Sequence, residues 1–143
     1  MTRELCLAQL AAFLDGEGCI TLLDRQRGTQ YGVYHLYQPH VVIGNTDKRL
    51  MDWLMSTFNG WVSKLQPTGR PNAKVGYSWH MTNIKRLLHD VYPYLLLKKE
   101  QAEILMNFPM SEKPNRHRTD KDKRRQERAC KRIRELNKRG VRA

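Results

Sequence analysis

Hydrophobic positions along the chain repeat with a helical period in some segments and with a strand period in others. Leu7, Leu10 and Leu14 recur at helical spacing, whereas residues 19–27 and 33–44 alternate as strands do. Glycine, proline and asparagine separate these segments. The predicted elements are, in order, a helix over residues 3–14, strands over 19–27 and 33–44, a helix over 47–58, strands over 61–66 and 74–82, and helices over 84–91 and 94–108.

Residues at the ends of these segments predict how the elements begin and end. We expect Gly16 and Gly18 to end the first helix, residues 45–47 to cap the second and Asn83 to cap the third. Pro39 lies inside the second strand, which indicates an edge position or a bulge because proline cannot donate to a neighbouring strand.

The order of elements predicts an α+β fold with an αββαββα core. Strands joined by short connections pair antiparallel, so we expect a four-stranded antiparallel sheet with helices on one face and the other face open. Ile20 and Leu22 would face the helices, and the residues between them would face outward. The tyrosines and tryptophans at positions 31, 34, 37, 61 and 79 are expected to pack in the core or on the sheet rather than to stack on bases.

Charge divides the chain into two parts. The net charge is +12, yet residues 1–110 carry 12 Lys+Arg against 9 Asp+Glu, and residues 111–143 carry 14 against 5. We therefore expect a domain over residues 1–110, a linker over 111–118 and a C-terminal basic helix over 119–143 that Thr119 caps and Gly140 ends. This tail is either a solvated helix with one weakly packed face or a helix laid along phosphates. An excess of positive charge indicates a polyanionic partner, and nucleic acid is the first candidate.

Several classes of protein are excluded at this stage. No apolar run approaches the roughly 18–20 residues of a membrane span, and no secretory signal precedes the first helix. The three cysteines lack C-x-x-C spacing, which argues against a disulfide framework or a zinc site. We expect no membrane partner, and a cytoplasmic protein of a prokaryote or phage, or an organelle-encoded one.

The string Leu10-Ala11-Ala12-Phe13-Leu14-Asp15-Gly16-Glu17-Gly18 resembles the LAGLIDADG motif of homing endonucleases. Two flanking segments strengthen the resemblance: residues 43–47 (IGNTD) open a helix after the second strand, and residues 93–102 (PYLLLKKEQA) resemble the family's segment before its last core helix. The resemblance covers roughly residues 5–108. It implies the fold predicted above and a site-specific DNA endonuclease.

The resemblance also implies roles for individual residues. A single motif implies a homodimer in which Ala8, Ala11 and Ala12 let two helices approach closely. Glu17, at a helix end where the dipole disfavours a carboxylate, would bind Mg²⁺ (or Mn²⁺) with the carbonyl of Gly16. The catalytic candidates are Glu17 as metal ligand, Asn45 for ordering water, Lys98 near the scissile phosphate, Arg49 as a weaker member of the same pocket, and Asp15 in a mainly structural role.

Sequence reading would fall to the open face of the sheet, where each subunit of the dimer contacts half of a long, nearly palindromic double-stranded DNA target. In the third strand we place Lys64 and Gln66 toward DNA, with Ser63 and Leu65 as the alternative register. The predicted DNA-binding residues are Thr21, Leu23, Arg25, Arg27, Gln38, His40, Lys64, Gln66, Arg70, Lys74, Ser78 and His80.

Other interpretations stay open from the sequence. Asn45 is equally suited to cap a helix, Lys98 to be a solvated helix charge, and the outward strand residues to form an ordinary polar surface. The alternative function is a protein that binds nucleic acid without cleaving it, either an intron RNA maturase or a DNA-binding regulator.

Overall fold

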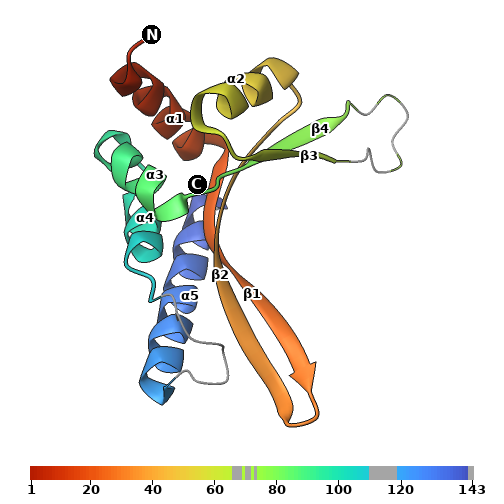
Figure 1. Ribbon diagram of the computed structural model, residues 1–143, viewed down its shortest axis with the longest axis vertical. Helices are drawn as coiled ribbons and strands as arrows, with labels where there is room; N and C mark the ends of the chain where they lie inside the picture. Colours follow the sequence, from red (N-terminus) through yellow and green to blue (C-terminus); the bar gives the residue numbers. More distant parts are fainter. Residues whose placement is uncertain (66–68, 70–71, 73, 110–118, 142–143) are drawn as a thin grey trace.

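The computed structural model describes residues 1–65, 69, 72, 74–109 and 119–141. Gln66, Arg70 and the predicted linker over 111–118 lie outside the described residues. Figure 1 shows the arrangement of the elements, which are α1 (Arg3–Glu17), β1 (Gly18–Thr29), β2 (Gly32–Asn45), α2 (Lys48–Phe58), β3 (Trp61–Leu65), β4 (Gly76–His80), α3 (Ile84–Val91), the short 3₁₀ helix η1 (Tyr92–Tyr94), α4 (Lys99–Met106) and α5 (Asp120–Val141).

The α+β fold is confirmed. The four strands form one antiparallel sheet in the order β1-β2-β4-β3. β1 and β2 pair along their whole length, from Gly18 opposite Ile43 to Thr29 opposite Gly32, and extend well beyond the shorter β3–β4 pair. The two pairs diverge in Figure 1 and leave a concave side between them.

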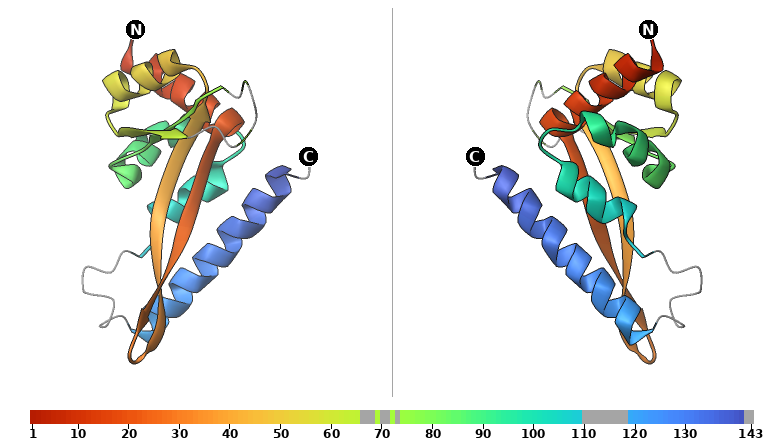
Figure 2. Two further views of the ribbon diagram at one scale, coloured as in Figure 1. Left: turned by 90° about the vertical axis from the view of Figure 1, so that its right-hand side faces the viewer. Right: turned by 90° about the vertical axis from the view of Figure 1, so that its left-hand side faces the viewer.

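One face of the sheet carries the core. Ile20, Leu22, Val41, Ile43 and Trp79 are all buried there, as their alternation predicts. In Figure 2 the helices α3, α4 and α5 lie together on the side of the β1–β2 hairpin opposite the concave side. The other face is not covered by any helix that the structure describes, so it is open to a partner.

Pro39 occupies an edge position, as the sequence indicated. It is paired with Leu22 on β1, but β4 pairs with β2 only from Val42 to Asn45. The backbone of β2 at residue 39 therefore faces no second strand, and the missing N–H of proline leaves no pairing partner unsatisfied.

Gly16 does not end α1, which continues through it to Glu17, and Gly18 is the C-cap. The reason that position 18 requires glycine is close packing and not an unusual backbone angle, since its φ is −85°. A Cβ at Gly18 would lie 2.7 Å from the Cα of Leu14 and 2.8 Å from its carbonyl oxygen. Only glycine lets the chain pass from helix into strand at this point.

α2 and α3 begin within one residue of the predicted starts, whereas the last core helix does not. Asp47, one of the residues 45–47 predicted to cap α2, is its cap, because its carboxylate accepts a hydrogen bond from the backbone N–H of Arg49 at 2.9 Å. Asn83 precedes α3 in a left-handed conformation (φ 51°) and makes no side-chain capping bond. The last core helix begins at Lys99 rather than at residue 94, since residues 92–94 form η1 and residues 95–98 are not helical.

The basic tail forms α5, which packs on the core. Thr119 accepts a hydrogen bond from the N–H of Asp122, which confirms it as the cap. Cys130 and Ile133 are buried in the same cluster as the sheet residues. Asn137 donates to the carbonyl of Ile20 on β1, at 3.3 Å, so α5 is tied to the sheet as well as packed on it. No helix in the described part of the chain is long and apolar enough to cross a membrane.

We predict that Ile133→Ala lowers the free energy of unfolding by about 2–5 kcal/mol, because it leaves a cavity beneath α5. The matched control is Lys131→Ala, two residues away on the exposed side of the same helix, which should change stability by less than about 0.5 kcal/mol. Urea denaturation followed by circular dichroism measures both. Equal free energies of unfolding for the two variants would mean that α5 does not pack against the core.

Candidate functional site

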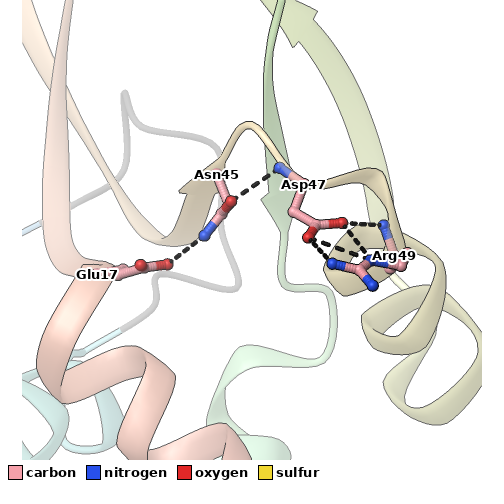
Figure 3. Close-up of polar contacts among 4 residues, drawn as sticks. All are labelled: Glu17, Asn45, Asp47 and Arg49. Carbon is pink, nitrogen blue, oxygen red and sulfur yellow. Dashed lines mark hydrogen bonds and ion pairs between the residues drawn. The ribbon is translucent and has the colours of Figure 1, made fainter.

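The end of α1 and the end of β2 meet at one corner of the sheet. Glu17 is the last residue of α1 and Asn45 is the last residue of β2. The side-chain amide of Asn45 donates to Oε2 of Glu17 at 2.8 Å, as Figure 3 shows. Glu17 is exposed and Asn45 is half-buried, so both side chains are accessible to solvent. This contact brings together two of the residues that the sequence singled out.

Asn45 also connects this corner to the start of α2. Its side-chain oxygen accepts from the backbone N–H of Asp47 at 2.8 Å. Asp47 in turn forms an ion pair with Arg49 at 2.7 Å. Hydrogen bonds from the Arg49 side chain and backbone lower the pKa of Asp47 to about 2. The guanidinium of Arg49 thus binds its own helix cap, and it reaches the Glu17 corner only through Asp47 and Asn45 (Figure 3).

Asp15 binds the segment between η1 and α4. Its carboxylate accepts backbone hydrogen bonds from Leu96 at 2.8 Å, Leu97 at 3.1 Å and Lys98 at 3.0 Å. A carboxylate that accepts several N–H groups is a strong anchor. These bonds hold residues 96–98 out of helical geometry, which explains why the last core helix starts at Lys99.

Lys98 binds the end of α1 in return. Its ammonium donates to the carbonyl oxygens of Leu14 at 2.7 Å and Gly18 at 2.5 Å, at the C-terminal end of α1. Burial lowers the pKa of Lys98, and the nearby Cys19 and Asp15 oppose that shift. The interpretation of Lys98 as a solvated helix charge is therefore wrong. Two of its three N–H donors are in use, and the third has no hydrogen bond among the described residues.

The residues at this corner offer oxygen ligands to a cation, but few of them. Oε1 of Glu17 has no hydrogen bond among the described residues, so it can accept a ligand without breaking the contact to Asn45. No group of three or more His, Cys, Asp or Glu side chains gathers anywhere in the described ranges. A carboxylate with one free oxygen suits Mg²⁺, which takes one or two carboxylates and completes its shell with water and phosphate.

Most of the predicted DNA-binding residues share the open face. The register pairs Thr21 with His40 and Leu23 with Gln38, while Val42 lies opposite His80 and Gly44 opposite Ser78. Residues directly opposite each other point to the same side of the sheet. The residues that the register places on the open face are Thr21, Leu23, Arg25, Arg27, Gln38, His40, Ser78 and His80. Lys74 is exposed and precedes β4.

The prediction for the third strand is wrong. Lys64 lies opposite Tyr77, which faces the helix side, whereas Ser63 lies opposite Ser78 on the open face. Tyr31 differs from the expectation of packed aromatics, because it is 90% exposed at the hairpin turn. Trp61 packs on the sheet as expected: it is 52% exposed on the open face and stacks on the ring of His80.

The three alanines of α1 that were predicted to contact a second subunit do not all lie on its exposed side. Ala11 is 1% exposed and packs into the core of its own chain, so it cannot contact a partner. Ala12 is exposed and Ala8 is half-buried. Ala12 lines one side of α1 together with Leu5 and Gly16, at helical spacing, and Gly16 has open space where a Cβ would be.

The fold was compared with those of known proteins. Neither a protein-family model nor a curated protein matches the sequence. The archaeal intron-encoded homing endonuclease I-Vdi141I, complexed with DNA, is 16% identical with a TM-score of 0.65 over 94% of this chain and 86% of that chain. The homing endonuclease I-CvuI in complex with the I-CreI target and Mg is 19% identical with a TM-score of 0.65, over 93% of this chain and 82% of that one. In another I-CvuI complex, with its own target and Ca, 73% of this chain matches 66% of that chain at 21% identity and a TM-score of 0.57.

The chain has the LAGLIDADG homing endonuclease fold. The likeness extends beyond the motif region, because coverage above 90% reaches past residue 110 into α5. Within the LAGLIDADG fold the motif Leu10–Gly18 spans the C-terminal half of α1 and the first residue of β1. Its two acids point to different partners: Asp15 to the chain before α4 and Glu17 to Asn45.

Sequence reasoning missed two features of this site. Nothing in the spacing indicated that Asp15 binds residues 96–98, because the contact joins positions more than 80 residues apart. The hydrogen bonds among Ser63, His80 and His40 across three strands were also missed, although correct strand register would have placed these side chains on one face.

We predict that Asp15→Asn destabilises the protein by about 1–2 kcal/mol, because a neutral amide accepts the three backbone bonds less well. Asp52→Asn on α2, an exposed carboxylate without an ion pair among the described residues, is the control and should have little effect. Hydrogen exchange should show faster exchange at the amides of Leu96, Leu97 and Lys98 in Asp15→Asn only. Unchanged exchange there would contradict the anchoring role of Asp15.

Proposed function

We propose that the chain is a site-specific DNA endonuclease, a homing endonuclease of the LAGLIDADG type, encoded in an intron or a free-standing mobile element. One observation carries this proposal: Glu17, at the end of α1, is held by Asn45, at the end of β2, where the helix meets the sheet. The structural neighbours are homing endonucleases in complex with DNA, which supports a DNA substrate.

Glu17 and the carbonyl of Gly16 are the proposed metal ligands, with Mg²⁺ or Mn²⁺ as the cofactor. When bound, such a cation activates water and stabilises the charge that develops at the phosphate. The free Oε1 of Glu17 supports this assignment, and the bond from Asn45 fixes the direction in which the carboxylate points. Since one carboxylate is too few for a protein-only site, the scissile phosphate and water would complete the coordination.

The remaining side chains of the corner position the phosphate and the water. Lys98 keeps one donor for a phosphate oxygen while its other two hold the end of α1. Asn45 orients the Glu17 carboxylate, and we propose that it also orders the attacking water. Asp15 is a positioning residue, because it acts on Lys98 through the backbone. Arg49 is a weaker candidate, since Asp47 occupies its guanidinium.

Double-stranded DNA is proposed to lie on the open face of the sheet. Arg25 and Arg27 are exposed on the distal half of β1, where they can contact phosphates or base edges. Gln38 and His40 from β2 and Ser78 and His80 from β4 present hydrogen-bonding groups on the same face. Cleavage of both strands requires two copies of the Glu17 corner, and a two-fold dimer would supply them.

The dimer is proposed to form through the exposed side of α1. Leu5 is 56% exposed there, and Leu96 and Leu97 are 85% and 75% exposed on the segment that Asp15 holds against the end of α1. Ala12 and Gly16 on the same side leave room for the backbone of a second helix. Large apolar side chains around small ones fit a buried helix–helix contact better than a solvent-exposed surface.

We predict that Glu17→Gln lowers Mg²⁺-dependent double-strand cleavage of a randomised-target DNA library by at least about 100-fold, with DNA binding retained. Glu4→Gln, on an exposed carboxylate in the first turn of the same helix, is the matched control and should cleave as the unmodified protein does. Binding without cleavage by all three proteins would instead support the nucleic-acid-binding alternative.

We predict that Ala12→Arg raises the dissociation constant of the dimer at least about tenfold, because a two-fold axis brings both new charges into one contact. Val33→Arg, at an exposed position of the β1–β2 hairpin far from α1, is the control. Sedimentation equilibrium without DNA measures both. A dimer unaffected by Ala12→Arg would place the interface elsewhere.

A further inference from the structure

A chain of hydrogen-bonding side chains crosses three strands on the open face. Nε2 of His40 on β2 lies 3.3 Å from Nδ1 of His80 on β4. Nε2 of His80 lies 3.0 Å from Oγ of Ser63 on β3. The register places all three residues on the same side of the sheet. Ser63 and His40 are therefore the two ends of one connected unit.

His80, in the middle of this chain, is fixed in orientation. Trp61 stacks on its ring with centroids 3.6 Å apart and an angle of 3° between the planes. Both ring nitrogens of His80 are already engaged, so neither is available to a ligand. The groups that remain available are Nδ1 of His40, which has no hydrogen bond among the described residues, and the hydroxyl of Ser63.

A neutral histidine carries one ring N–H, so the directions of these hydrogen bonds are linked. When His40 donates to His80, His80 donates to Ser63. The hydroxyl of Ser63 is then free to donate, and Nδ1 of His40 can only accept. When His80 donates to His40 instead, Ser63 donates to His80, so Oγ of Ser63 can only accept and Nδ1 of His40 donates. The two ends can therefore never both donate: Ser63 donates only when Nδ1 of His40 accepts, and Nδ1 of His40 donates only when Ser63 accepts.

We propose that His40 and Ser63 read two bases as a coupled pair, in which the two residues cannot both contact hydrogen-bond acceptors: when one donates to an acceptor on its base, the other accepts from a donor. The inference rests on the proposed function, because it requires DNA on the open face. In the major groove the amino groups of cytosine and adenine are donors, and O6 and N7 of guanine and O4 of thymine are acceptors. His80 couples the hydrogen-bonding roles of His40 and Ser63 and contacts no base. Trp61 is a positioning residue that holds the ring of His80.

Both rings are kept in the neutral form that this coupling needs. Burial lowers the pKa of His40, and the charge of Arg25 lowers it further. Burial and the neighbouring His40 also lower the pKa of His80. Since an unperturbed histidine has a pKa near 6.5, neither ring carries a charge at pH 7.5.

The coupling is tested by sequencing the DNA that the protein binds from a library of randomised targets. We expect two base positions whose preferences covary, with combinations of two hydrogen-bond acceptors disfavoured by on the order of tenfold relative to combinations that include a donor. His80→Phe keeps an aromatic ring against Trp61 but removes both nitrogens. The two positions should then still show preferences but vary independently. Absence of covariance in the unmodified protein, or its persistence in His80→Phe, would overturn the proposal while leaving the nuclease function intact.

A second measurement needs no DNA. Long-range ¹H–¹⁵N spectra of the free protein at pH 7.5 report the tautomer of each histidine. Because one proton lies between the two rings, His40 and His80 must share the same tautomer, either both Nε2–H or both Nδ1–H. Opposite tautomers would overturn the coupling. Shared tautomers in a protein that binds no DNA would refute the proposed function, and base reading with it.

Discussion

One carboxylate and one ammonium lock the end of α1 to the segment before α4. Asp15 accepts three backbone hydrogen bonds from residues 96–98, and Lys98 returns two hydrogen bonds to the last carbonyls of α1. The ammonium also offsets the negative end of the helix dipole at the point where Glu17 adds another negative charge. Because β1 begins at Gly18, immediately after this lock, the position of the whole β1–β2 hairpin depends on it.

The contacts of Asp15 and Lys98 also explain which residues occupy the end of α1. Gly18 is required because any Cβ would meet Leu14, whose carbonyl Lys98 binds. The side chain of Glu17, the last residue of α1, then contacts Asn45. The antiparallel pairing of β1 and β2 places Asn45, at the end of β2, close to the start of β1. The end of α1 thus carries a carboxylate with one free oxygen, and an ammonium with one free donor is hydrogen-bonded to the carbonyl of the next residue, Gly18. That pair of groups suits a phosphate and a cation bound together.

Local pattern was enough to predict the order of elements and the buried face of the sheet. Ile20, Leu22, Val41 and Ile43 occupy every second position of their strands, and burial follows that period of two. The start of α4 was not predictable, because residues 94–98 suit a helix and only the distant Asp15 prevents it. The register of β3 was not predictable either, since its five residues have no clear alternation and pairing with β4 decides which side faces out. The packing of α5 was not predictable either, because Cys130 and Ile133 are the only buried hydrophobic side chains among the described residues of a highly charged helix.

The proposed function depends most on Glu17 as a metal ligand. The most direct measurement is a crystal structure of the protein bound to its DNA target with Ca²⁺ in place of Mg²⁺. If Glu17 binds the metal, a cation lies about 2.3–2.6 Å from its Oε1 and also contacts a phosphate oxygen of the DNA on the open face. A DNA complex in which the Glu17 carboxylate contacts only Asn45, with the cation absent or bound at other residues, would contradict it.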